Sequence, residues 1–122
     1  MKRWVTLGMY SLFAQAKRVD WDKLFDLLKG SGVFTGVSLH LLSPWGQHPT
    51  DPFYPWPYGG TKFNMLKRNQ EWLDMLKDVL STGLKEGIDF ELCFNDRYFI
   101  NKWIKYLPFK AHPFRDNNIG VD

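Results

Sequence analysis

The sequence has little of what stabilises disulfide-rich or metal-binding proteins. Cys93 is the only cysteine among 122 residues, so an intrachain disulfide and a CxxC metal site are both excluded. The three histidines, His40, His48 and His112, lack the spacing of metal ligands. We find no phosphate-binding glycine loop, Walker-type lysine or Ser-His-Asp arrangement. We therefore expect neither a metal nor a cofactor.

Long apolar runs are also missing. None approaches the ~18 consecutive apolar residues that a membrane span needs, so we expect a soluble chain that does not enter a membrane. The first sixteen residues resemble a secretory signal that ends in Ala14-Gln15-Ala16. Thr6 and Gly8 interrupt its apolar run, so we interpret residues 5–13 as a strand and infer no cleaved signal peptide; the cellular location stays open.

Aromatic residues and one basic segment are what the sequence has in excess. Aromatic side chains make up 17% of the chain, more than one core requires, so several have to lie elsewhere. The formal net charge of +3 is mild. Residues 97–115, however, carry basic side chains and no acidic one, which permits a polyanionic partner without requiring it.

Three apolar segments are predicted to be strands, at residues 5–13, 37–42 and 88–94. Two amphipathic helices separate them. Asp20 is the expected N-cap of the first helix, and Gly30 and Gly32 should end it. Asn64 or Asn69 should cap the second, and Gly87 should follow its last turn.

Strands that alternate with helices imply right-handed crossovers and a parallel sheet. We therefore predict an α/β fold with a parallel βαβαβ core, in a single domain over residues 1–122.

Several segments resemble the second and third βα units of cellulase-like and mannanase-like (β/α)8 glycoside hydrolases. The similarity is carried by Pro52-Phe53-Tyr54-Pro55-Trp56, Lys62-Phe63-Asn64, Asn69-Gln70-Glu71-Trp72-Leu73, Gly87-Ile88-Asp89-Phe90-Glu91-Leu92 and His112-Pro113-Phe114 with Asn117-Asn118. The resemblance implies a partial, incomplete TIM-type barrel and a role with β-linked polysaccharides. It also implies a catalytic glutamate pair on the fourth and seventh strands. The 122 residues end before those strands, so we expect no catalytic pair in this chain, and enzymatic activity stays an open question.

The candidate site follows from where ligand-binding residues lie in such folds, just past the carboxyl ends of the strands. Polar residues follow the third strand, and aromatic residues fill the long loop after the second. Aromatic rings can stack on the apolar faces of sugars while polar groups bind the hydroxyls. The predicted ligand-binding residues are Trp45, Tyr54, Trp56, Asn95, Asp96, Arg97 and His112. The alternative for the rings is that they hold the proline-rich loop against the domain.

Glu91 and Asp96 are the tempting carboxylate pair. Five residues of extended strand separate them by roughly 16 Å, too far for a glycosidase pair. We interpret Glu91 as a polar group that hydrogen-bonds to a neighbouring strand.

Three functions remain open. The first is a piece of a glycoside hydrolase, and the second is a non-catalytic structural or sugar-binding module of a larger assembly. The third, which we consider least favoured, is nucleic-acid binding through residues 97–115. The expected partners are a polysaccharide or oligosaccharide, and a second copy or another chain that covers the open sheet edges.

Overall fold

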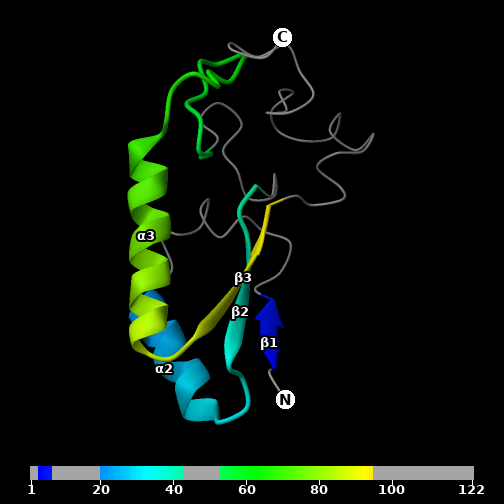
Figure 1. Ribbon diagram of the computed structural model, residues 1–122, viewed down its shortest axis with the longest axis vertical. Helices are drawn as coiled ribbons and strands as arrows, with labels where there is room; N and C mark the ends of the chain where they lie inside the picture. Colours follow the sequence, from blue (N-terminus) through cyan, green and yellow to red (C-terminus); the bar gives the residue numbers. More distant parts are fainter. Residues whose placement is uncertain (1–2, 7–19, 43–52, 95–122) are drawn as a thin grey trace.

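The computed structural model describes residues 3–6, 20–42 and 53–94 (Figure 1). The elements, in chain order, are β1 (Trp4–Thr6), α2 (Trp21–Ser31), β2 (Gly36–His40), α3 (Gln70–Lys85) and β3 (Asp89–Cys93). Strands and helices alternate, as the sequence pattern predicts.

The strands form one sheet in the order β1-β2-β3, and both neighbouring pairs are parallel. Trp4 pairs with Gly36 at one end of β1, and Gly36 in turn pairs with Asp89 of β3. The predicted parallel βαβαβ core is therefore confirmed as a small three-stranded α/β unit.

The second and third strands are shorter than predicted, at Gly36–His40 and Asp89–Cys93. The described part of the first strand stops at Thr6, and residues 7–13 lie outside the described residues. β2 ends at His40, and the next two residues, Leu41 and Leu42, are buried in a bend. The Leu41 backbone N–H still donates to the Cys93 carbonyl of β3 at 3.0 Å, so the apolar run ends two residues past the strand but only one past its last bond to β3.

Helix α2 begins where its cap predicts. The Asp20 side chain accepts a hydrogen bond from the backbone N–H of Lys23 at 3.0 Å, which satisfies a free donor of the first turn. The helix continues through Gly30 and ends at Gly32, whose φ of 63° is left-handed. The prediction that Gly30 takes part in ending the helix was wrong.

Helix α3 is capped by Asn69, whose side chain accepts from the backbone N–H of Trp72 at 3.2 Å. Of the two predicted caps, Asn64 instead binds the backbone N–H of Leu66 within a turn. Gly87 has a φ of 75°, as expected just beyond the last turn. Leu84, in the last turn of α3, is 61% exposed, so the buried side of this helix ends before it.

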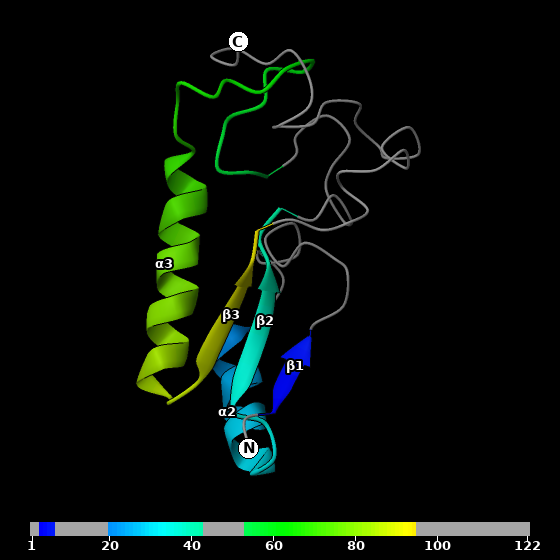
Figure 2. The same cartoon turned by 45° about the vertical axis from the view of Figure 1, so that its right-hand side comes forward.

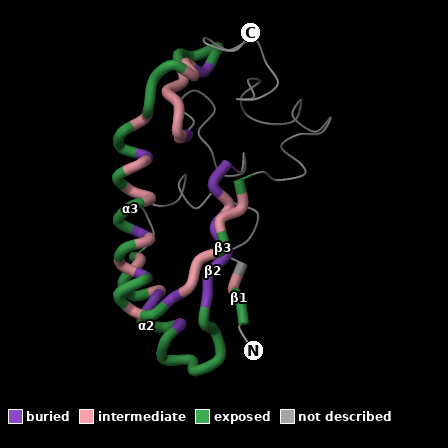
Figure 3. The backbone as a smooth tube through the Cα atoms, in the orientation of Figure 1, coloured by how far each residue is buried: buried purple, intermediate pink, exposed green. Residues whose placement is uncertain are grey.

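Both helices lie on the same face of the sheet (Figure 2). Phe90 of β3 makes an edge-to-face contact with Phe25 of α2, with ring centroids 5.9 Å apart. Val37 and Leu39 of β2 are fully buried beneath this layer. Figure 3 shows the buried residues concentrated on β2 and on the helix sides turned toward it.

Within residues 3–6, 20–42 and 53–94, no helix combines the length and the apolar character that a membrane crossing requires.

Candidate functional site

The sheet face opposite the helices is polar near its carboxyl end. Side chains alternate between the two faces of a strand, and Val37 and Phe90 belong to the helical face. The neighbours of Val37 along β2 and of Phe90 along β3 therefore turn to the other face. Ser38 pairs with Glu91 there, and His40 pairs with Cys93. We call Ser38, His40, Glu91 and Cys93 the polar face.

Ser38 and Glu91 are joined by a hydrogen bond from the serine hydroxyl to the carboxylate Oε2. Ser38 is only 4% exposed, whereas Glu91 is exposed. The interpretation of Glu91 as a polar group bonded to the neighbouring strand is confirmed. A carboxylate has two acceptor oxygens, so Glu91 keeps the capacity to accept from a ligand while Ser38 fixes its position.

His40 is the next polar-face residue toward the carboxyl end of β2, and it is half-buried. Its Nδ1 atom is buried and has no hydrogen-bond partner among the described residues. Buried polar atoms in proteins are usually paired, so an unpaired one marks a position where a ligand atom would be stabilising. Since the Ser38 hydroxyl donates to Glu91, it is not held by the imidazole as a nucleophile would be.

Sequence reasoning did not select Ser38 or His40 as site residues. The signal was present in the second predicted strand, where these two polar residues stand two apart among apolar ones. A fully buried strand would be apolar on both faces, so this spacing indicates one polar face.

Tyr54, a predicted sugar-stacking residue, is fully buried. Its ring packs edge-on against Phe63, with centroids 5.3 Å apart, and its carbonyl accepts from the Asn69 side chain at 2.9 Å. Burial raises the pKa of the Tyr54 phenol well above its ordinary value. This burial favours the alternative interpretation for this ring, in which it holds the loop against the domain.

Trp56, the second predicted ring, is half-buried and packs against the core cluster. It belongs to the segment of residues 53–69, which lies beyond the carboxyl ends of β2 and β3 (Figures 1 and 2). An aromatic residue is therefore available on the same side as the polar ends of the strands.

The other predicted site residues, Trp45, Asn95, Asp96, Arg97 and His112, lie outside the described residues. Of the seven predicted site residues, the structure therefore describes only Tyr54 and Trp56, and the other five stay a prediction.

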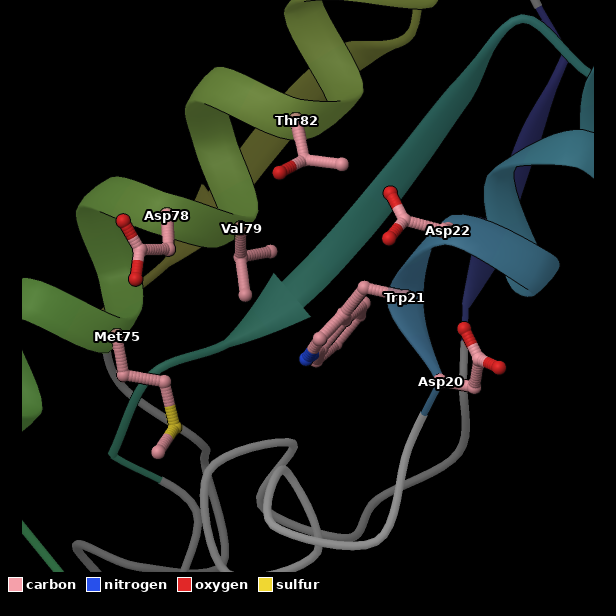
Figure 4. Close-up of a pocket in the computed structure, with 7 residues that line it drawn as sticks. All are labelled: Asp20, Trp21, Asp22, Met75, Asp78, Val79 and Thr82. Atoms are coloured by element: carbon pink, nitrogen blue, oxygen red, sulfur yellow. The ribbon is translucent and has the colours of Figure 1, made fainter.

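A separate hollow lies between α2 and α3, on the helical side of the sheet (Figure 4). Its lining combines carboxylates with apolar side chains, from Asp20, Trp21, Asp22, Met75, Asp78, Val79 and Thr82. No local pattern in the sequence indicates this hollow, because its residues come from two helices that are far apart in the chain.

Across the part of the chain that the structure describes, no group of three or more His, Cys, Asp or Glu residues could hold a metal ion. In comparisons with known proteins, no family model, no curated sequence and no solved structure matches this chain.

Proposed function

We propose that this chain is a carbohydrate-active domain that corresponds to the first three βα units of a (β/α)8 barrel, and that it binds a polysaccharide or oligosaccharide. The order β1-β2-β3, with both helices on one face, is the arrangement of consecutive units in such a barrel. In that fold the helix-free face of the strands lines the interior, and ligands bind at the carboxyl ends.

The observation that carries the proposal is the polar face. Barrel interiors are filled mainly by branched apolar residues, so polar residues near the carboxyl ends indicate a binding role. The exposed Glu91 carboxylate accepts hydrogen bonds, and Nδ1 of His40 is a buried polar atom without a partner among the described residues. Sugar hydroxyls both donate and accept, which suits such a mixed set of groups.

Trp56 supplies the apolar half of a sugar site. Half-buried rings stack on the apolar faces of sugars, and Trp56 lies in the segment beyond the strand ends. Trp45, Asn95, Asp96, Arg97 and His112 would complete the same rim under this proposal.

One observation favours binding over hydrolysis. Glycosidases need two carboxyl groups on either side of the glycosidic bond. Glu91 is held by Ser38 in the neighbouring strand, which suits a carboxylate that positions a hydroxyl. A non-catalytic sugar-binding module is therefore our preferred form of the proposal.

The test is retention of the chain on insoluble β-glucan and β-mannan. We expect the wild type to be retained and Trp56→Ala to bind about tenfold more weakly, the scale of one lost aromatic contact. Trp4→Ala is the matched control, because Trp4 is 40% exposed at the opposite, amino end of the sheet. Failure of the wild type to bind, or an equal loss in both variants, would overturn the proposal.

Two further readouts separate the alternatives. Release of reducing sugar by the isolated chain would show that it is an enzyme. Binding to single-stranded nucleic acid that weakens steeply with salt would instead favour the role of residues 97–115.

A further inference from the structure

The segment of residues 53–69, which lies beyond the carboxyl ends of β2 and β3, is basic (Figures 1 and 2). Its charged residues are Lys62, Lys67 and Arg68, and it contains no acidic residue. All three side chains are exposed. Among the described residues, no ion pair neutralises any of them. We call these three residues the basic rim.

This excess of one sign of charge is not shared by the helices. Helix α2 contains two acidic and two basic residues, and α3 contains three acidic and two basic ones. Lys29 of α2 is also neutralised by Glu86 at 2.9 Å. The helices therefore carry no excess of positive charge. The basic rim carries three charges of the same sign, and their mutual repulsion is relieved when an anion binds.

An ordered backbone holds the basic rim beside an aromatic residue. The backbone N–H of Asn69 donates to the carbonyl of Pro55 at 2.7 Å. Arg68 and Trp56 are the chain neighbours of these two residues, so this bond brings their backbones close together. Trp56 is half-buried and packs against the core cluster, so a ligand that stacks on it orders little that is not already ordered. The segment therefore offers an aromatic surface and positive charge in one structure.

The class of ligand follows from these groups and from the adjoining polar face. Lysine and arginine side chains bind carboxylate and sulfate groups, and an aromatic ring stacks on a sugar. A nucleic acid would bring a negative charge on every nucleotide to the exposed carboxylate of Glu91. A sugar chain with more widely spaced charges avoids that repulsion and presents hydroxyl groups to Glu91. We infer that the basic rim binds the carboxylate or sulfate groups of an acidic polysaccharide, an inference that rests on the proposed function and narrows its substrate class.

The test compares three soluble polymers that share one β-glucan backbone. Hydroxyethyl-cellulose is neutral, carboxymethyl-cellulose carries carboxylates, and cellulose sulfate carries sulfates. Binding to the wild type is followed by tryptophan fluorescence at about 0.15 M salt, where attraction between distant exposed charges is largely screened. We expect at least one acidic polymer to bind about tenfold more tightly than the neutral one, the scale of a few partly exposed ion pairs. The tighter of the two acidic polymers identifies the anionic group.

Two triple variants separate the basic rim from the overall charge of the chain. The rim variant replaces the three residues of the basic rim by glutamine. The control variant removes the same charges from exposed residues before β1 and along α3, by Arg3→Gln, Lys77→Gln and Lys85→Gln. We expect the rim variant to bind the acidic and neutral polymers equally. The control variant should keep the wild-type preference within about twofold.

The possible failures can be told apart. Equal binding of the neutral and acidic polymers by the wild type would overturn the inference and leave the proposed function standing. Absence of binding to all three polymers would overturn the proposed function as well. An equal loss of preference in the two variants would indicate attraction to the overall charge and overturn the inference. Tighter binding of single-stranded DNA than of either acidic polymer would assign the basic rim to a nucleic acid instead.

Discussion

At the scale of single residues, Gly83 marks the closest approach of α3 to the sheet. A Cβ atom at this position would lie 2.3 Å from Cζ of Phe90 and 3.2 Å from Cζ of Phe25. Because Gly83 has no side chain, α3 can pack directly against the rings of Phe90 in β3 and Phe25 in α2.

We predict that Gly83→Ala destabilises the fold by about 1–3 kcal/mol, because the added methyl group overpacks this contact. Gly30→Ala is the control in α2. It adds the same methyl group with nothing within 4 Å, and should stabilise by about 0.5–1 kcal/mol through helix propensity. Urea unfolding of both variants, followed by circular dichroism, checks the prediction. A neutral Gly83→Ala would mean that the helix shifts at little cost.

Tyr54 gives a prediction about alkaline pH. Burial raises the pKa of its phenol in the folded state, so above pH 10 the unfolded chain loses this proton while the folded chain keeps it. The folded state then binds more protons, and the free energy of unfolding falls as pH rises, by up to about 1.4 kcal/mol per pH unit. Tyr54→Phe should flatten this decline in unfolding experiments between pH 9 and 11.

Deprotonation of Lys29 also lowers the stability of the folded state at high pH, so its contribution has to be measured separately from that of Tyr54. The hydrogen bond to Glu86, 2.9 Å long, raises the pKa of the Lys29 ammonium, so this contribution too is lost at high pH. Lys29→Met separates the two effects. A decline that survives unchanged in Tyr54→Phe but disappears in Lys29→Met would contradict the role given to Tyr54.

At the scale of elements, Asn69 links the segment of residues 53–69 to α3. Its side-chain oxygen caps the helix at Trp72, and its side-chain nitrogen donates to the Tyr54 carbonyl. One residue therefore fixes both the start of the helix and the position of the loop that precedes it.

We predict that Asn69→Ala costs about 1–2 kcal/mol, because the helix loses its cap and the loop loses a hydrogen bond. Asn69→Ser should recover part of this stability, since serine caps a helix but cannot reach the carbonyl in the same way. Thermal unfolding of the three proteins measures both steps. If the serine variant is no better than alanine, the bond to the loop matters more than the cap.

The elements themselves could be predicted from the sequence because their signals are local. Asp20 and Asn69 are capping residues, and Gly32 and Gly87 are placed where a left-handed residue is needed. Strand ends were less accurate, because Leu41 and Leu42 are buried in the core although they lie in a bend beyond the end of β2.

The candidate site was only partly predictable, because it depends on register between distant strands. Nothing local indicates that Ser38 pairs with Glu91 or that His40 lies beside Cys93. Tyr54 could not be assigned from the sequence for a different reason. An aromatic residue in a loop can either bind a ligand or pack in the core, and this one is buried.

At the scale of the whole molecule, the described sheet has two edges, β1 and β3. Strand edges expose unpaired backbone groups and recruit partners. We predict that the chain associates through these edges, with itself or with a second chain, and that light scattering after gel filtration gives a mass above one copy when the partner is present. A monomer at all concentrations, with no co-purifying chain, would contradict this.

The register of the sheet also bears on how the chain folds. Residues joined across β1 and β2 are 32 positions apart, and Ser38 and Glu91, joined across β2 and β3, are 53 apart. Pairing residues so far apart in the chain costs conformational entropy before the strand contacts can compensate for it. We therefore expect this topology to fold slowly for its size. During synthesis on the ribosome, β2 can pair with β1 as soon as it emerges, but the edge of β2 that pairs with β3 stays open to chaperones until β3 follows.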